Sequence, residues 1–214
     1  MNLQISGLTE VLGMFIYFLL ALVALWGLFC VVMAWRRVAQ VRFRNEGAQD
    51  DFLDQVERSV VAGDFESAKQ LCEEDGRAMP QLVHLAVENR NLGATKLRHL
   101  VADRFQRDVM ADLEHRLSWV QTVIKSAPMI GLFGTVIGMM GAFASLGMAE
   151  GGKVDATNLS EDISLALITT ACGLAIAIPL VLAVASINVR IRRMEDLVGA
   201  GLTRFFDIFR GVIG

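Results

Sequence analysis

The sequence predicts an all-α integral membrane protein with three membrane-spanning helices and a helical domain outside the membrane. Three stretches, at 11–35, 126–149 and 163–189, contain no charged residue and no histidine. Each is longer than the roughly 20 residues that a helix needs to cross a hydrocarbon core of about 30 Å. The chain is also 54% hydrophobic, with a mean hydropathy of +0.47, which is too apolar for an ordinary soluble domain.

The first span is expected at residues 13–35 and is expected to remain in the mature protein. The residues before it include no Lys or Arg, and its apolar run is too long for the core of a typical signal peptide. Because basic residues concentrate on the cytoplasmic side of a membrane, residues 1–12 are predicted to be periplasmic. The basic residues that follow the span are Arg36, Arg37, Arg42 and Arg44.

Residues 36–125 are predicted to form a cytoplasmic helical domain. An amphipathic stretch at 50–62 is expected to form one helix. Asp64 is expected to be the N-cap of the next, since its side chain can accept a hydrogen bond from a backbone N–H of the first turn. Pro80 suits the first turn of a third helix that runs to about Asn91. No strand-like alternation of useful length occurs, so no sheet is expected.

A very long helix is predicted from Thr95 into the second span. Apolar residues recur along it at spacings of three and four, and Pro128 is the one residue expected to kink it. Such a stripe needs partners, either other cytoplasmic helices or neighbouring subunits; alternatively, the helix folds against its own domain. The stripe consists of Leu97, Val101, Phe105, Val109, Leu113, Leu117, Val120 and Ile124.

The second and third spans are expected at 126–148 and 159–189, joined by a periplasmic loop at 149–158. Asn158 and Glu161 have the spacing of a capping box, which would start the third span near Leu159.

The C-terminal tail, residues 190–214, is predicted to be cytoplasmic. Basic residues flank the inner ends of the second and third spans, at Lys125, Arg190, Arg192 and Arg193, which agrees with a periplasmic N-terminus and a cytoplasmic C-terminus. The tail is amphipathic, and it is expected either to lie on the membrane surface or to continue as a helix into the cytoplasm.

Small residues follow one face of the second and third spans. In a bilayer, helix association relies on close packing, which small side chains permit. Tight packing within one subunit would explain this pattern as well as packing around a pore does. The residues predicted to pack around a pore are Gly131, Gly134, Gly138, Gly141, Ala166, Gly173 and Ala177.

Threonines interrupt the same two spans, with Thr135 in the second span and Thr169 and Thr170 in the third. At about 1.5 Å per residue, Thr135 and Thr170 lie roughly 18–20 Å below the outer helix ends. Hydroxyls at one depth on adjacent helices could line a polar path for an ion. Alternatively, each hydroxyl bonds a carbonyl of its own helix one turn back, as threonine does in membrane helices.

The residue types that are missing restrict the function. Proton or cation translocation generally needs an ionisable residue inside the membrane, and the three uncharged stretches contain none. If the protein conducts ions, the carboxylate is therefore expected from another chain.

Without a phosphate loop, a metal-ligand spacing or a nucleophile–base pair, neither an enzyme nor a metal or cofactor is expected. The net charge of −3 indicates no nucleic-acid partner. The cysteines, interpreted as small apolar fillers, are Cys30, Cys72 and Cys172.

Two motifs resemble a known family. The segment 125–143 reads KSAPMIGLFGTVIGMMGAF, and the segment 162–183 reads DISLALITTACGLAIAIPLVLA. They are similar to the second and third spans of the ExbB/TolQ proteins of the MotA/TolQ/ExbB proton channel family, with the patterns AP-x-x-GL-x-GTV-x-G and AL-x-x-T-x-x-GL-x-x-AIP. The number of spans and the large cytoplasmic insertion extend the resemblance to most of the chain.

The resemblance implies a homopentamer in the lipids of the bacterial inner membrane, surrounding two copies of a single-span partner of the ExbD/TolR type. That partner carries a membrane Asp, the acid that this chain lacks. Flow of H⁺ or Na⁺ down its gradient would drive a rotary motor. The work would pass to the periplasm or outer membrane through a TonB-like or Tol–Pal-like transport system.

Within the resemblance, Thr135 and Thr170 match threonines that face the partner's Asp. ExbB and TolQ typically carry Glu five residues before the third-span threonine, where this chain has Leu165. Thr169 beside Thr170 makes a pair resembling sodium-driven flagellar stators, so both H⁺ and Na⁺ stay open. A non-conducting scaffold of an envelope or secretion assembly is the alternative function. A neighbouring gene for a short single-span protein with a membrane Asp would favour the motor.

Overall fold

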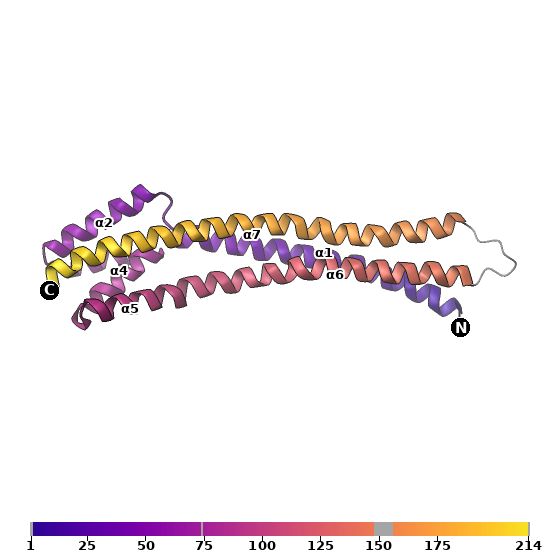
Figure 1. Ribbon diagram of the computed structural model, residues 1–214, viewed down its shortest axis with the longest axis horizontal. Helices are drawn as coiled ribbons and strands as arrows, with labels where there is room; N and C mark the ends of the chain where they lie inside the picture. The colour runs from indigo at the N-terminus through magenta and orange to yellow at the C-terminus, as the bar shows by residue number, and fades with distance from the viewer. Residues whose placement is uncertain (1, 74, 148–155, 214) are drawn as a thin grey trace. The chain divides into compact units, whose positions relative to one another are not determined.

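The computed structural model describes residues 2–73, 75–147 and 156–213 (Figure 1). Every element in these ranges is a helix and none is a strand, which confirms the all-α fold class. In chain order the elements are α1 (Asn2–Val41), α2 (Glu46–Val61), α3 (Phe65–Glu73), α4 (Ala78–Glu88), the 3₁₀ turn η1 (Arg90–Leu92), α5 (Ala94–Arg104), the π-helical η2 (Phe105–Met110), α6 (Ala111–Gly147) and α7 (Ala156–Ile213).

The chain forms two compact units, and α1, α6 and α7 contribute residues to both. The first unit contains Met1–Val32 and Leu117–Val184. The second contains Met33–Arg116 and Ala185–Gly214. The first unit therefore holds the apolar helical segments, and the second holds the shorter helices α2 to α5.

Three helical runs contain a stretch long and apolar enough to cross a bilayer: Val11–Val41, Ala94–Phe143 and Ile163–Val212. Large apolar side chains stay exposed along them, including Met14 at 77% and Met129 at 69%. Leaving such a side chain in water rather than burying it costs about 1.5–3 kcal/mol, whereas lipid chains solvate it. The chain is an all-α integral membrane protein, as predicted; the side of the membrane that each loop faces stays a prediction.

In the first unit, α1 packs closely against both α6 and α7. Gly27 allows the approach, because a Cβ there would lie 2.8 Å from side-chain carbons of both Leu180 and Val123. Ten residues earlier, the Tyr17 hydroxyl donates to the carbonyl oxygen of Leu165 at 3.3 Å. A polar hydrogen without an acceptor is costly inside a bilayer, so this bond favours one position of α1 beside α7.

The long helix predicted from Thr95 is present, but it is not a uniform α-helix. α5, η2 and α6 follow one another directly, so the chain is helical from Ala94 to Gly147. The prediction missed the π-helical turn η2. Steps of four residues, which the apolar stripe takes from Leu97 to Leu117, overshoot a full α-helical turn by about 40° each. A π-helical turn holds more residues than an α-helical one, and it corrects part of this drift.

Most of the predicted stripe is buried within the single chain. Only Phe105 and Ile124 among its members are half-buried rather than buried. The chain's own helices therefore cover the stripe, which fits both the expected packing on other cytoplasmic helices and the alternative of a helix folded against its own domain. Neighbouring subunits are not needed to cover it. The buried members are Leu97, Val101, Val109, Leu113, Leu117 and Val120.

Local signals in the second unit act as expected. The Asp64 carboxylate caps α3 by accepting the backbone N–H of Ser67 at 3.0 Å. Hydrogen bonds from Ser67 also lower the pKa of Asp64. Pro80 lies in the first turn of α4, as predicted, although α4 ends at Glu88 and a 3₁₀ turn follows it.

The C-terminal tail continues α7 as a helix and docks on α2 in the second unit. The side chain of Gln49, which is buried, donates to the carbonyl of Leu197 at 2.6 Å. Gly201 provides the room, because a Cβ there would lie 2.7 Å from the Gln49 amide nitrogen. Arg204 adds an ion pair with Asp54 at 2.5 Å. Of the two expectations for the tail, the helical continuation is therefore the one observed.

α7 is described from Ala156, so Asn158 is already helical and the expected start near Leu159 is too late. The side chains of Asn158 and Glu161, on which the capping box depends, lie outside the described residues. So does most of the loop predicted at 149–158.

Candidate functional site

In the first unit, one turn of α6, residues 131–135, lies against one turn of α7, residues 166–170. Gly131 allows this, because a Cβ there would lie 2.7 Å from the carbonyl oxygen of Thr169 and 3.0 Å from the Cα of Thr170. Both of these are backbone atoms, which cannot turn aside as a flexible side chain can. The two helix backbones therefore meet at this level, as small residues in membrane helices permit.

The same close approach continues along the two helices. A Cβ on Gly134 would lie 2.6 Å from the Thr169 hydroxyl oxygen, and one on Gly138 would lie 2.6 Å from the Ala166 Cβ. On α7, a Cβ on Gly173 would lie 2.6 Å from the carbonyl oxygen of Ala127. These glycines pack α6 against α7 of the same chain, and a place around a pore stays a prediction.

The remaining residues predicted for packing lie on the same two helices. Ala166 and Ala177 are buried, and Gly141 is half-buried.

Three hydroxyl groups and two carbonyl oxygens gather where the two turns meet. The Thr169 hydroxyl lies 2.7 Å from the carbonyl oxygen of Ala166 and 3.0 Å from that of Gly131. The Thr135 hydroxyl lies 3.2 and 3.3 Å from the same two oxygens. The Thr170 hydroxyl lies 3.2 Å from the Gly131 oxygen and also hydrogen-bonds the Thr135 hydroxyl. The structure thus brings together all three threonines predicted for the ion path; we call them the hydroxyl cluster.

The hydroxyl cluster has more hydrogen-bond contacts than protons. Each hydroxyl carries one proton and two acceptor lone pairs, so three protons serve six contacts. The protons can therefore shift between alternative acceptors. In only one of the six contacts, the bond between Thr135 and Thr170, does a hydroxyl act as acceptor. Lone pairs consequently remain for an incoming donor or cation.

The cluster combines both expectations for the threonines. Bonds from Thr135 to Gly131 and from Thr169 to Ala166 run back along their own helices. The bonds that Thr170 makes cross to α6 instead.

The hydroxyl cluster is buried at Thr169 and partly exposed at Thr135 and Thr170. Thr169 is only 4% exposed, whereas Thr135 and Thr170 are half-buried. Around α7, residue 169 is about 40° from residue 165, and residue 170 is about 100° further on. Around α7, Thr169 therefore lies between Leu165, whose backbone carbonyl accepts the hydrogen bond from Tyr17, and Thr170. Sequence reasoning placed all three threonines in the path, but only Thr135 and Thr170 are partly exposed.

Tyr17 is a polar residue at this level that sequence reasoning missed. Its acceptor, the carbonyl of Leu165, directly precedes the Ala166 carbonyl that the hydroxyl cluster contacts. The signal available was the single tyrosine of the chain, placed within an apolar span. The Leu165 side chain itself is 54% exposed and brings no charge to the site.

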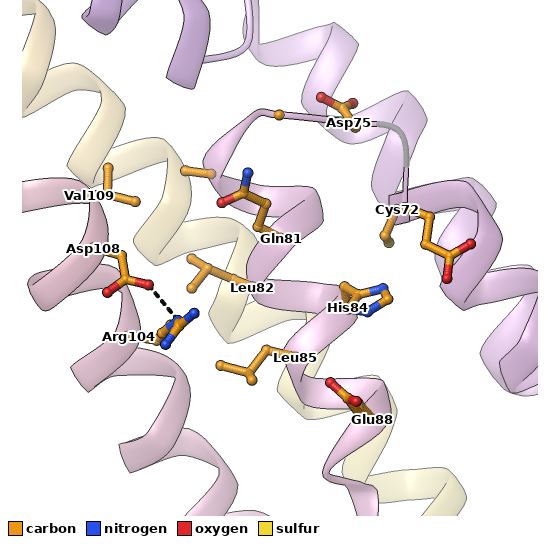
Figure 2. Close-up of a pocket in the computed structure, with 13 residues that line it drawn as sticks. Cys72, Asp75, Gln81, Leu82, His84, Leu85, Glu88, Arg104, Asp108 and Val109 are labelled. Carbon is orange, nitrogen blue, oxygen red and sulfur yellow. Dashed lines mark ion pairs between the residues drawn. The ribbon is translucent and has the colours of Figure 1, made fainter.

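A cavity of about 520 Å³ lies in the second unit, between α3, α4, α5 and η2. Figure 2 shows the ion pair of Arg104 and Asp108 at its edge, and these side chains are 2.5 Å apart. Burial and the nearby Asp75 carboxylate raise the pKa of Cys72 to about 12, so this thiol stays protonated at neutral pH. Within the described ranges, no three potential metal ligands of the His, Cys, Asp or Glu type gather. The cavity was not predicted.

A sequence model of the MotA/TolQ/ExbB proton channel family matches residues 76–199. The matched region covers more than half of the chain and includes the whole hydroxyl cluster. The chain belongs to this family. Membership accords with the two motifs at 125–143 and 162–183, both of which lie within the matched region.

Relatives in this family have similar sequences. The chain is 32% identical over 136 residues to a putative biopolymer transport protein, ExbB-like 1, of Synechocystis sp., covering 58% of this chain and 51% of that protein. It is 37% identical over 117 residues to the putative ExbB-like 2 protein of Helicobacter pylori, covering 55% and 73%. It is 38% identical over 96 residues to the Tol-Pal system protein TolQ of Haemophilus influenzae, covering 45% and 41%. The chain thus spans about half the length of the first of these relatives.

Proposed function

We propose that the protein is an ion-conducting motor subunit of the bacterial inner membrane, and not an enzyme. With a single-span partner of the ExbD/TolR type, it couples the proton or sodium motive force to mechanical work in the periplasm or at the outer membrane. The observation that carries the proposal is the hydroxyl cluster, in which the half-buried Thr135 and Thr170 share a hydrogen bond beside the buried Thr169.

The hydroxyl cluster supplies what a partner's carboxylate needs during a protonation cycle. An ionised carboxylate accepts hydrogen bonds from the Thr135 and Thr170 hydroxyls. Once protonated, the acid becomes a donor, and the same hydroxyl oxygens accept from it. Because the hydroxyl protons have alternative acceptors at Gly131 and Ala166, the cluster can change from donor to acceptor without a movement of the helices. This property lowers the cost of both charge states inside the membrane.

Thr169 has a supporting role in this proposal. Its hydroxyl is buried against α6, where it bonds the Gly131 carbonyl at 3.0 Å. It therefore positions the Gly131 carbonyl and the neighbouring Thr170 rather than meeting the ion. Both Na⁺ and H⁺ remain candidates for the coupling ion, because Thr169 and Thr170 are adjacent threonines and Leu165 stands where ExbB and TolQ typically carry Glu.

The assembly that we propose is a homopentamer around two copies of the partner, each with a membrane Asp. The family membership and the relatives named ExbB and TolQ support this assembly. A TonB-like or Tol–Pal-like system would receive the work. A carboxylate from the partner would complete a site that, in this chain, consists of hydroxyl and carbonyl oxygens.

Reconstitution tests the proposal. The chain would be co-purified with its single-span partner and placed in vesicles, and influx of H⁺ and Na⁺ would be followed with ion-sensitive dyes in Na⁺ and Na⁺-free buffers. We expect flux only when both proteins are present, and the two buffers identify the ion. Vesicles that contain both proteins and stay closed to both ions would contradict the motor and favour the non-conducting scaffold.

A further inference from the structure

In the second unit, the side chains of Trp35 and Arg190 are in contact, and each lies at the end of an uncharged stretch. The stretch 11–35 ends at Trp35, and the stretch 163–189 ends immediately before Arg190. The guanidinium carbon of Arg190 lies 4.0 Å from the centre of the Trp35 ring. Because each stretch is long enough to cross the hydrocarbon core, this pair lies at the boundary between lipid chains and headgroups, where Trp and Arg are both enriched.

Arg190 is held in place while its hydrogen-bond donors stay unused. Stacking on an aromatic face orients the planar guanidinium, which carries five N–H donors and no acceptor. Within the described part of the chain, Arg190 makes no hydrogen bond or ion pair, although it is half-buried. A guanidinium that is oriented in this way and still has free donors is suited to bind an acceptor from outside the chain.

Two further arginines lie at the same boundary. Arg36 follows Trp35 in the chain, at a similar depth and about 100° further round α1, and Arg193 is three residues beyond Arg190, about 60° away on the same side of α7. The nearest described carboxylates along α7 belong to Glu195 and Asp196, and neither forms an ion pair with these arginines. Positive charge at this level is therefore left without compensation by the described chain.

We propose that Arg36, Arg190 and Arg193 bind the phosphate of an anionic phospholipid such as phosphatidylglycerol. The guanidinium group matches the geometry of a phosphate through paired N–H donors. A lipid is the fitting occupant because the site lies at headgroup depth, and the net negative charge of its headgroup complements three arginines. This arginine site is independent of the ion path, since it lies in the other compact unit.

Arg192 provides a matched control. It carries the same charge and lies two residues from Arg190, yet it points about 160° away around α7. It is exposed and has no ion pair among the described residues. A site-specific effect should therefore appear in Arg190→Gln and not in Arg192→Gln, whereas a general effect of net charge should appear equally in both.

Native mass spectrometry of the full chain in detergent tests the site by counting bound lipids during titration with phosphatidylglycerol or phosphatidylcholine. We expect the wild type to prefer phosphatidylglycerol. Arg190→Gln should reduce that preference about fivefold, which is the contribution of one basic residue at an anionic membrane surface, and Arg192→Gln should leave it unchanged. Equal losses in the two variants, or no loss in either, would overturn the proposal. If circular dichroism shows that Arg190→Gln is misfolded, the exposed Arg193→Gln takes its place in the same comparison.

Discussion

The hydroxyl groups of Thr135 and Thr170 share a hydrogen bond, although 35 positions separate these residues in the chain. The bond depends on Gly131, where any larger residue would push the α7 backbone away from α6. A polar contact within the proposed ion path is thus set by backbone packing one helical turn away. Packing and conduction can therefore be tested separately, by substitutions that change one and preserve the other.

Replacing Thr135 or Thr170 with valine is expected to reduce partner-dependent ion flux by about 10- to 100-fold. Valine keeps the shape and removes the hydroxyl, so a hydrogen bond to a charged group, worth about 1.5–3 kcal/mol, is lost. Flux into vesicles measures the effect. Thr122→Val is the control, because its exposed hydroxyl bonds the carbonyl of Ser118 in its own helix at 3.0 Å. Normal flux in both cluster variants would reject the role of the two threonines.

Thr169→Val is expected to affect stability more than flux. Its hydroxyl is buried between α6 and α7, so its loss should lower the free energy of unfolding by about 1 kcal/mol. Ion flux should stay within about threefold of the wild type, because the partly exposed hydroxyls of Thr135 and Thr170 remain. Thermal unfolding and vesicle flux, measured on the same preparation, separate the two effects. A loss of flux as large as that of Thr170→Val would show that Thr169 meets the ion directly.

Gly173→Ala is expected to destabilise the α6–α7 contact. The new Cβ would lie 2.6 Å from the Ala127 carbonyl oxygen and 3.1 Å from the Cα of Pro128. Because these are backbone atoms, the helices must separate, and overpacking of this kind costs about 1–3 kcal/mol. Thermal unfolding in detergent measures the loss.

Gly13→Ala is the matched control for that substitution, because no atom lies within 4 Å of a Cβ at Gly13. Alanine is the better helix former, so this variant should unfold at the same temperature as the wild type or slightly above it. Equal unfolding temperatures for the two alanine variants would mean that α6 and α7 do not meet at Gly173.

Stability should depend on pH through Asp112. Partial burial acts to raise the pKa of Asp112, but hydrogen bonds from Arg37 and Arg116 hold this pKa below its ordinary value. A lowered pKa in the folded state means that the stabilisation is complete above the unfolded value of about 3.9 and is lost as the pH falls through the folded value. Asp112→Asn should therefore be less stable than the wild type by about 1 kcal/mol at pH 7.

The difference between wild type and Asp112→Asn should shrink as the pH is lowered below about 4, and unfolding by denaturant at each pH measures it. Asp103→Asn is the control, because Asp103 is exposed and forms no ion pair among the described residues. A difference for Asp112→Asn that stays constant from pH 7 to pH 3 would contradict the link to its titration.

The sequence was sufficient for features that local patterns mark. Uncharged stretches predicted three membrane-spanning helices, and the bounds of the spans stay predictions. Single residues such as Asp64 and Pro80 marked helix starts, because caps and first turns depend on neighbours in the chain. The depth count also placed Thr135 and Thr170 at one level, since the rise of a helix is fixed.

Features that depend on contacts between distant segments were not predictable in this way. Thr169 and Thr170 are adjacent and identical in type, and only the position of α6 distinguishes the buried one from the half-open one. The bond from Tyr17 to Leu165 joins residues 148 positions apart. The π-helical turn η2 likewise carries no Pro or Gly that would mark it in the sequence.

The central claim is that a carboxylate of another chain reaches Thr170, and a disulfide cross-link tests it most directly. Thr170→Cys would be combined with a partner in which the membrane Asp is changed to Cys, after the native cysteines of this chain are replaced by alanine. Ile168→Cys is the control, because residue 168 is exposed and points about 160° away from residue 170. The account predicts a cross-linked heterodimer with Thr170→Cys and none with Ile168→Cys. A cross-link at residue 168 alone, or at neither position, would contradict it.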